Sequence, residues 1–439
     1  MVKLVKIALA LAAVVGVSAN DNGKARTPPL GWRSWNLYGH HVNQPLIESI
    51  MDGMLEKKRM VDGVPTSLCD LGYCDVGLDD YWQECGSPDA APGMHYHGVD
   101  GKPLVNFTRF PSMKKMTDHA HGLGLTAGFY GNNCGCSDHC TDSEDCAWQI
   151  KGDVDAFVEF NFDSWKLDGC GGELNLVLFN EFLVAAGKNI TVENCHWGSA
   201  VPFKPDRTLP PARGCPWNFY RSSGDVRASY ASIIHNLGTV APLHTANLSY
   251  PGCWAYPDML QVGCAHGPAG ALDPGLSDAE TRTHFGSWAI VSSPLTLSHD
   301  VHNDTISDAI WPVIANKEVL AVNQAYFGDS GGVYETSTDV GLTVELTDAF
   351  IEASPSEPRV TAAAYQKLYK PVGGGKVAVL LMNSDTATHT MQTNFSKVPG
   401  LSCTSCPVRD IWNHKDLGTA SGSWSGPVGG HDAAFLVIG

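Results

Sequence analysis

Two residues with complementary chemistry stand close together in Ser164-Trp165-Lys166-Leu167-Asp168-Gly169-Cys170. The alternation of apolar and charged residues predicts a half-buried strand that ends at Asp168, with Gly169 in the turn. Because side chains two positions apart share one face of a strand, Lys166 and Asp168 should point into one cavity. A neighbouring cation would keep this carboxylate ionised and nucleophilic. An ordinary strand that ends at an Asp-Gly turn is the alternative interpretation.

A second aspartate ends the segment Arg221-Ser222-Ser223-Gly224-Asp225. A retaining glycosidase needs two carboxyl groups, one to attack the anomeric carbon and one to protonate the leaving oxygen. Asp168 and Asp225 would suffice for these roles if their surroundings differ. Arg221 is a candidate ligand for a sugar hydroxyl on the same side of the strand. A surface salt bridge between Arg221 and Asp225 is the alternative.

Other clustered polar residues raise the question of a metal. Asp79-Asp80 either forms a solvated acidic turn or accepts hydrogen bonds from sugar hydroxyls. The sequence has no His or Cys at zinc spacing and no calcium-loop pattern, so no metal site is expected. A group of closely spaced cysteines imitates a metal site: Cys134, Cys136, Cys140 and Cys146. In a secreted chain disulfides are favoured instead, and Cys403-x-x-Cys406 should be a small structural disulfide for the same reason.

Strand-like and helix-like runs alternate from residue 30 to about residue 328, as in a parallel α/β protein. The strand candidates are residues 30–36, 73–80, 125–131, 164–169, 190–195, 219–226, 253–260 and 289–298. The helix candidates are one that Asn43 caps, one at 113–120 that Gly122 closes, and those at 174–186 and 226–237. Eight such units predict an α/β fold of the (β/α)8 TIM-barrel type in residues 20–328, with its chemistry at the strand C-termini.

The residues at these strand ends are mostly carboxylates and aromatics. They are Trp35, Asp79 with Asp80, Tyr130, Asp168, Cys195 with Trp197, Asp225, and Asp258. Aromatic faces stack on the C–H surfaces of sugars, and carboxylates hold hydroxyl groups. Repeated Asp and Trp at one rim therefore predict a carbohydrate-binding site.

The last part of the chain has a different pattern. Short β-runs at 342–346, 377–382, 388–392, 408–412 and 433–438 predict a C-terminal antiparallel β-sandwich domain in residues 329–439. Hydrophobic residues make up 43% of the chain and charged ones 17%, which indicates a globular protein. The net charge of −17 would repel phosphate backbones and anionic membranes, so nucleic acid is not expected as a partner.

Residues 1–19 have the pattern of a signal peptide: Lys3 and Lys6, then an apolar run, then small residues up to Ala19. A retained membrane anchor is the alternative, although the run is short for one. Fourteen cysteines, all after this leader, also indicate the secretory pathway. Five N-glycosylation sequons agree: Asn106, Asn189, Asn247, Asn303 and Asn394. We expect a protein that is secreted or reaches a lysosome or vacuole, with no membrane attachment after cleavage.

These residues resemble the melibiases, the retaining α-galactosidases and α-N-acetylgalactosaminidases of glycoside hydrolase family twenty-seven. The similar segments, in the family's order, include residues 27–36, Asp79-Asp80-Tyr81-Trp82, Lys166-Leu167-Asp168-Gly169-Cys170, 221–225, Pro257-Asp258-Met259-Leu260 and Arg409-Asp410-Ile411-Trp412. The resemblance implies Asp168 as nucleophile, Asp225 as general acid/base, and no metal or organic cofactor. It also implies sugar binding by Trp35, Asp79, Asp80, Tyr130, Lys166, Arg221 and Asp258.

The chain departs from the family pattern at several positions. Tyr81 stands where a Cys is usual, so that disulfide is expected at Cys85, and Ala255-Tyr256 replaces Asn-Asp. The usual Cys-Glu-Trp loop, which surrounds the C2 substituent of the sugar, is Cys195-His196-Trp197 here. In one branch of the family the Cys and Trp contact the sugar, which makes Cys195 and Trp197 candidates, unless Cys195 is tied to Cys215. The resemblance also pairs Cys170 with one of Cys134, Cys136 or Cys140.

The sequence thus predicts a retaining exo-glycosidase that removes terminal α-D-galactosyl residues by double displacement. An α-N-acetylgalactosaminidase or a β-L-arabinopyranosidase of the same family is the nearest alternative, because His196 leaves the choice at C2 open. A non-catalytic galactose-binding protein is a more distant one. The expected partner is an α-galactoside carbohydrate, and a homodimer is one possible assembly.

Overall fold

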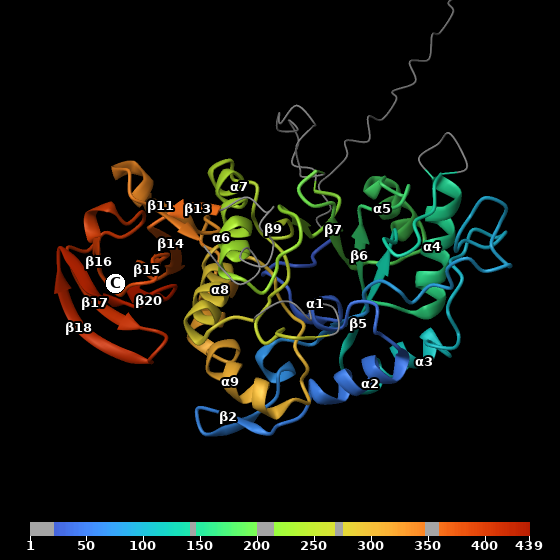
Figure 1. The fold of residues 1–439 in the computed structure, drawn as a ribbon, viewed down its shortest axis with the longest axis horizontal. Coiled ribbons are helices and arrows are strands. Elements are labelled where there is room, and N and C mark those ends of the chain that lie inside the picture. Colours follow the sequence, from blue (N-terminus) through green and yellow to red (C-terminus); the bar gives the residue numbers. More distant parts are fainter. Residues whose placement is uncertain (1–21, 141–145, 200–214, 268–274, 347–359) are drawn as a thin grey trace, which may run out of the picture.

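The computed structural model describes residues 22–140, 146–199, 215–267, 275–346 and 360–439. The predicted signal peptide lies outside the described residues. Figure 1 shows an α/β part, in blue to yellow, beside a β-rich part that forms the C-terminal end of the chain. Among the helices within the described ranges, none is long and apolar enough to cross a membrane.

A central sheet of eight parallel strands builds the first part. Its strands are β1 (Leu30–Arg33), β4 (Asp75–Gly77), β5 (Thr126–Gly131), β6 (Ser164–Asp168), β7 (Thr191–Cys195), β8 (Phe219–Arg221), β9 (Trp254–Tyr256) and β10 (Leu295–Leu297). They are ordered β10-β1-β4-β5-β6-β7-β8-β9. The two strands at the ends of this order, β9 and β10, also approach each other: the backbone N–H of Leu260, shortly after β9, donates to the carbonyl of Thr296 in β10 at 2.9 Å. The sheet curls round in this way, and the predicted TIM-barrel class is confirmed.

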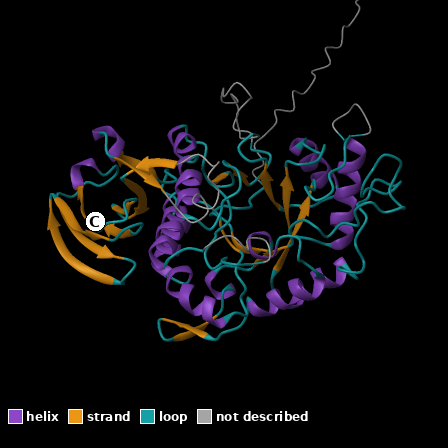
Figure 2. Cartoon of the chain, in the orientation of Figure 1, coloured by secondary structure: helices purple, strands orange, loops and turns teal. Residues whose placement is uncertain are grey.

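Helices cover the outside of this sheet (Figure 2). They are α2 (Gln44–Gly53), α3 (Met113–Gly122), α4 (Ala147–Phe160), α5 (Leu176–Ala185), α6 (Tyr230–Gly238), α7 (Ala241–Thr245), α8 (Asp278–Ile290), α9 (Asp304–Ile314) and α10 (Lys317–Gln324). The short α1 (Trp35–Tyr38) comes directly after β1 and lies in the middle of the view in Figure 1. The predicted cap of α2 is confirmed, because the Asn43 side chain accepts a hydrogen bond from the N–H of Leu46 at 2.9 Å. A small hairpin of β2 (Arg59–Val61) and β3 (Val64–Thr66) lies apart from the main sheet.

Several predicted boundaries were wrong, each for a local reason. Residues 289 and 290 end α8, so the last strand begins later than predicted. Gly122 is still helical, and Gly124, with φ of +76°, makes the left-handed turn that follows α3. The helix predicted at 226–237 starts at Tyr230, because Ser229 caps it by accepting from the N–H of Ser232. All of β6 is buried rather than half-buried, since helices cover the outer face of a parallel sheet.

The C-terminal part consists of antiparallel strands, as predicted. Its strands are β11 (Gly332–Thr336), β12 (Thr343–Leu346), β13 (Val360–Ala363), β14 (Tyr365–Gly373), β15 (Lys376–Asn383), β16 (His389–Asn394), β17 (Ser405–Asp410), β18 (Lys415–Ser421), β19 (Ser423–Val428) and β20 (Ala433–Ile438). Six of them form one sheet, β11-β14-β15-β20-β17-β18, and the rest pair as β12-β13 and β16-β19. Helix α8 packs on β15 and β20, and Arg282 of α8 binds Asp432 at 2.6 Å.

Six disulfides link cysteines of the described residues: Cys69–Cys74, Cys85–Cys136, Cys134–Cys170, Cys140–Cys146, Cys215–Cys253 and Cys403–Cys406. The small Cys403–Cys406 disulfide is confirmed, and the partner of Cys170 is Cys134. The alternative of a disulfide between Cys195 and Cys215 is wrong, because Cys215 forms its disulfide with Cys253. Cys195 is a free, buried thiol, which leaves it available for contact with a ligand.

Candidate active site

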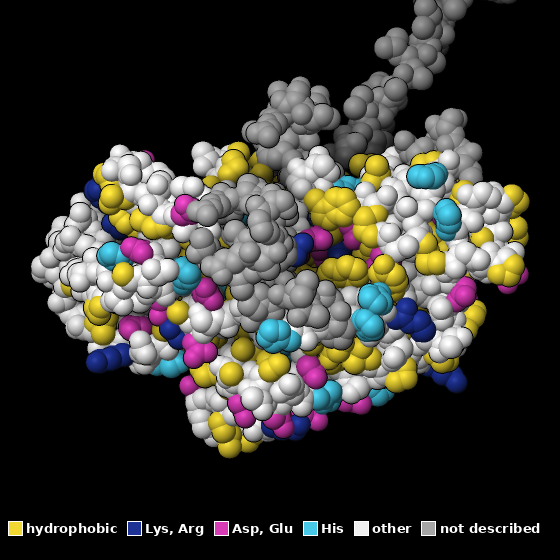
Figure 3. Space-filling model, viewed as in Figure 1, with side chains coloured by type: hydrophobic (Ala, Val, Ile, Leu, Met, Phe, Trp, Pro, Cys, Tyr) yellow, Lys and Arg dark blue, Asp and Glu magenta, His cyan; other side chains and the backbone are white. Residues whose placement is uncertain are grey.

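The predicted site residues meet at the C-terminal ends of the barrel strands. Figure 3 shows acidic and basic side chains in a hollow in the middle of one face, with hydrophobic side chains around it. The residues come from consecutive strands or from the turns after them: Asp79 and Asp80 after β4, Tyr130 from β5, Lys166 and Asp168 from β6, Cys195 from β7, Arg221 from β8 with Asp225 after it, and Asp258 after β9. Segments far apart in the sequence therefore supply one site.

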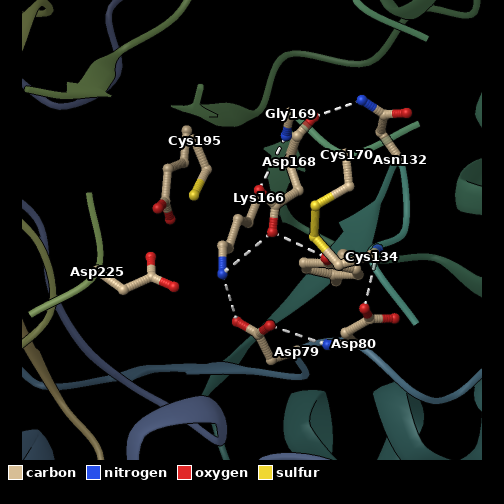
Figure 4. Close-up of polar contacts among 12 residues, drawn as sticks. Asp79, Asp80, Asn132, Cys134, Lys166, Asp168, Gly169, Cys170, Cys195 and Asp225 are labelled. Atoms are coloured by element: carbon tan, nitrogen blue, oxygen red, sulfur yellow. Dashed lines mark hydrogen bonds and ion pairs between the residues drawn. A yellow bond between two sulfur atoms is a disulfide. The ribbon is translucent and has the colours of Figure 1, made fainter. Parts of the chain in front are cut away.

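Asp168 is held by donors on several sides (Figure 4). The Tyr130 hydroxyl donates to its Oδ2 at 2.8 Å, and the N–H of Gly169 donates to its Oδ1 at 2.8 Å. The Asn132 side chain donates to the Asp168 carbonyl oxygen, which fixes the backbone at this position. Asp168 is only 5% exposed. Its carboxylate is thus fixed in position before any ligand arrives, as an attacking group must be.

Lys166 connects two carboxylates of the site. Its Nζ lies 2.9 Å from Oδ2 of Asp79 and 3.8 Å from Oδ2 of Asp168, and 5.1 Å from the centre of the Tyr130 ring. Burial alone would lower the pKa of Lys166, but the neighbouring acids, with Asp79 first among them, raise it well above its usual range. Lys166 and Asp168 share one face of β6, as predicted. The closer partner of the ammonium group, however, is Asp79.

Asp79 and Asp80 are both 1% exposed, so the solvated acidic turn is excluded. Their side chains separate: Asp79 reaches Lys166, whereas Asp80 accepts from the backbone N–H groups of Cys134 at 3.0 Å and Gly135 at 2.7 Å. Burial raises the pKa of the Asp80 carboxyl. Asp80 therefore holds the loop after β5, and the Cys134–Cys170 disulfide ties that loop to the turn after Asp168.

Asp225 has surroundings opposite to those of Asp168. Its side chain is 66% exposed, and its Oδ1 accepts from Nη2 of Arg221 at 3.0 Å. Arg221 itself is buried, and its Nη2 also lies 2.9 Å from Oδ2 of Asp258. The contact is therefore no simple surface salt bridge, because its cation lies inside the barrel. Figure 4 shows the Asp225 carboxyl across the site from Lys166 and Asp168.

Asp258 is held in a strained conformation. Its φ is +122°, which non-glycine residues rarely adopt. Its carboxylate accepts from the N–H groups of Val226 and Met259 at 2.9 and 2.6 Å. Burial raises the pKa of Asp258, and the Arg221 guanidinium acts in the opposite direction. This backbone strain points the carboxylate at Arg221, which is a sign of a functional position.

The rim of the site carries aromatic and sulfur groups. Trp197 is 40% exposed at a left-handed φ of +50°, and Trp35 stacks on Tyr81 at 6.3 Å with an interplanar angle of 12°. The Cys195 thiol accepts a hydrogen bond from Nη1 of Arg221 at 3.3 Å. His196 is buried, and this burial lowers the pKa of its imidazole.

Three further residues support the site, and the sequence analysis did not identify them. They are Asn132, which holds Asp168, and the pair Arg33 and Glu193, whose side chains approach to 3.3 Å inside the barrel. Glu193 pairs in register with Lys166 on the neighbouring strand. Its position two residues before Cys195, like that of Lys166 before Asp168, was a signal that could have found it.

Comparisons with known proteins agree with this arrangement. A family model described as "Alpha galactosidase A" matches residues 27–325, and one described as "Alpha galactosidase C-terminal beta sandwich domain" matches residues 363–438. The barrel and these matches define a glycoside hydrolase. More particularly, the chain belongs to the alpha-galactosidase A family.

Individual relatives are similar over nearly their whole length. The chain is 27% identical to an alpha-galactosidase of Cyamopsis tetragonoloba, over 95% of this chain and 87% of the relative. It is 28% identical to an alpha-galactosidase of Oryza sativa subsp. japonica, over 96% and 86%. The crystal structure of alpha-galactosidase I from Mortierella vinacea superposes with a TM-score of 0.72 at 23% identity, over 95% of this chain and 98% of the other. This last likeness shows the shared fold.

Proposed function

We propose that this glycoside hydrolase removes terminal α-D-galactosyl residues with net retention of anomeric configuration. The observation that supports this most is the contrast between two carboxyl groups in one site. Asp168 is buried and held by Tyr130 and Gly169, whereas Asp225 is open to solvent on the opposite side. A nucleophile must be fixed in place, and an acid/base must reach both the leaving group and water.

The reaction proceeds in two displacements. Asp168 attacks the anomeric carbon while Asp225 gives a proton to the glycosidic oxygen, so the C–O bond to the leaving group breaks as the glycosyl-enzyme bond forms. Asp225, now ionised, then takes a proton from water, and the resulting hydroxide displaces Asp168. Lys166 and Arg221 lie beside the two carboxyls and stabilise the negative charge that each carries in turn.

The polar groups around these two carboxyls bind the sugar. Asp79, Lys166, Arg221 and Asp258 present charged atoms to the site, where they form charge-assisted hydrogen bonds to hydroxyl groups. Trp35 and Trp197 supply apolar faces at the rim. Tyr130 and Asp80 position the nucleophile and the loop beside it. Cys195 lies opposite Asp168 in the register of β6 and β7, and the family resemblance implies that its loop surrounds the C2 substituent of the sugar.

Azide rescue tests the two assigned roles. Asp168→Gly should hydrolyse an aryl α-galactoside very slowly, and azide should restore turnover as the β-galactosyl azide, because azide attacks from the vacated face. Asp225→Ala with the same substrate should form the α-galactosyl azide, because azide then attacks the glycosyl-enzyme. Asp339→Asn, on the exposed surface of the C-terminal part, is the matched control and should keep full activity. The same azide anomer from both active-site variants would refute the assignment.

Nitrophenyl glycosides test the sugar. We expect the α-galactoside to be cleaved faster than the α-N-acetylgalactosaminide and the β-L-arabinopyranoside. A preference for either of these two would keep the mechanism and change the substrate. Saturable galactose binding by folded protein with no turnover of any of the three would instead support the non-catalytic alternative. Secretion is also proposed, on the basis of the leader and the disulfides, and N-terminal sequencing of the secreted protein tests cleavage after Ala19.

A further inference from the structure

Four buried ionisable side chains have no part in the proposed glycosidase mechanism. They are His97, Asp138, Asp153 and Glu173, each at most 3% exposed. His97 precedes α3, Asp138 follows β5, Asp153 lies in α4, and Glu173 follows β6. Three acids and one imidazole in the protein interior carry excess negative charge if all are ionised, and burying such charge without compensation is costly.

The orientation of the His97 ring is fixed from one side. Its Nδ1 lies 2.8 Å from Oδ2 of Asp138. That carboxylate also accepts from the backbone N–H groups of Tyr96 and His97, each at 3.2 Å, and from that of His95. A carboxylate with so many donors is an acceptor, so the proton of a neutral imidazole resides on Nδ1. The lone pair of Nε2 is then left on the opposite side of the ring.

That lone pair faces two further acceptors. Nε2 of His97 lies 3.3 Å from Oδ1 of Asp153 and 3.4 Å from Oε1 of Glu173, and all three atoms lie within 4.8 Å of one another. Both oxygens of Glu173 and Oδ2 of Asp153 have no hydrogen-bond partner among the described residues. A cation between the three groups would satisfy these atoms.

We propose that His97, Asp153 and Glu173 bind a divalent transition-metal ion, with zinc as the best fit. Zinc takes four tetrahedral ligands at about 2.0–2.1 Å, for which neighbouring ligand atoms stand about 3.3–3.4 Å apart. The two distances from Nε2 have these values. An imidazole ligand disfavours calcium and magnesium, which prefer oxygen. Asp138 is then the outer carboxylate that orients a metal-bound histidine.

Such an ion has a structural role next to the active site. The N–H of Glu173 donates to Oδ1 of Asn132 at 3.2 Å, and the amide of Asn132 donates to the carbonyl of Asp168. A metal on Glu173 would therefore brace the turn that carries Asp168. The sequence analysis expected no metal, because these ligands lie up to 76 residues apart in the chain and match no zinc spacing. A cluster that holds protons instead, on Nε2 and between Asp153 and Glu173, is the rival explanation.

Metal content and thermal unfolding of the whole protein distinguish the two explanations. After treatment with a chelator and dialysis, titration with zinc should load one ion per chain and raise the unfolding temperature. Cobalt(II) in place of zinc should give the visible absorption of tetrahedral coordination. Glu173→Gln, which keeps the size of the side chain, should stay folded and lose both responses. The matched control is Glu159→Gln, on the exposed surface of α4, which should keep both.

A second variant tests the outer carboxylate. Asp138→Asn should weaken zinc binding by about 10–100-fold while the site still binds at higher concentration. The metal site is refuted if folded wild-type protein takes up no stoichiometric zinc or cobalt and its unfolding temperature does not respond to either. An equal response in Glu173→Gln and wild type would also refute it. Neither readout depends on glycoside turnover, so this result is independent of the proposed function.

Discussion

The ion pair of Lys166 and Asp79 provides a test of how much the pairing of buried charges in the site contributes to the free energy of unfolding. In Lys166→Met the side chain keeps its apolar part and most of its length but loses its ammonium group. The Oδ2 atom of Asp79, which now lies 2.9 Å from Nζ, would then be buried without the cation that binds it. Removal of one member of a buried ion pair costs about 3–5 kcal/mol, because the other charge remains buried and uncompensated. We expect a loss of this size in the free energy of unfolding.

The double variant Lys166→Met/Asp79→Asn separates the cost of an orphaned charge from the loss of contacts. With both charges removed, most of the lost stability should return, since a buried ion pair replaced by neutral groups is often nearly neutral in free energy. Urea unfolding of wild type, both single variants and the double variant gives the coupling energy directly. A single variant within about 1 kcal/mol of wild type would refute the reasoning, as would a double variant less stable than Lys166→Met.

Activity in this series should not follow stability. Both side chains lie in the site and are proposed to bind sugar hydroxyls. The double variant should therefore be stably folded but nearly inactive on the aryl α-galactoside. If the double variant recovered activity together with stability, Lys166 and Asp79 would act only as structural partners. The assay therefore tests the proposed binding role separately from the ion pair.

Two further predictions concern pH and packing. Burial alone would raise the pKa of Asp329, but hydrogen bonds from His244 and Tyr369 lower it to about 2, from the usual 3.8. The ionised Asp329 carboxylate therefore contributes fully to the free energy of unfolding above about pH 4, and this contribution is lost as the pH falls through 2. In urea unfolding, Asp329→Asn should lower the free energy of unfolding by about 2 kcal/mol at pH 6 and by little near pH 2. Gly152→Ala in α4 should lower the free energy of unfolding by about 1–3 kcal/mol, because its Cβ would lie 1.8 Å from a backbone carbonyl oxygen. In the control Gly122→Ala, in α3, the new Cβ meets no atom within 4 Å, so this variant should be more stable by up to about 1 kcal/mol. Equal unfolding temperatures for these two glycine variants would contradict the packing argument.

Much of the fold was predictable because its signals are local. Each barrel strand is a short apolar run with turn residues after it, and helix caps such as Asn43 act within a few residues. The strand order follows from the rule that successive strands of a barrel are neighbours. Boundaries were less certain: residues 289 and 290 are as apolar as a strand, but they continue α8, which is buried on almost every side. A buried helix and a buried strand have the same apolar composition.

The rule that the chemistry of a barrel lies at the C-terminal ends of its strands also predicted which residues would meet, because those ends lie together on one side of the barrel. Asp168, Lys166 and Tyr130 are neighbours for this reason, and the residues themselves determine that the site is acidic and aromatic. Their individual surroundings were beyond the sequence. Lys166 lies closer to Asp79 than to Asp168 by less than 1 Å, and Cys195 is free because other cysteines pack together; neither could be read from the sequence.

The cluster of His97, Asp138, Asp153 and Glu173 is the clearest case of a feature that the sequence could not predict. None of these residues belongs to a spacing motif, and each was unremarked in the sequence, yet the fold brings them within hydrogen-bonding distance in a region without exposure to solvent. The sequence by itself determined the class of fold, the strand ends and the carboxylates that supply the chemistry. Only the tertiary structure decided the charge partners, the disulfide pairs and this buried cluster, because electrostatic energies depend on separation and burial, and neither is a property of spacing along the chain.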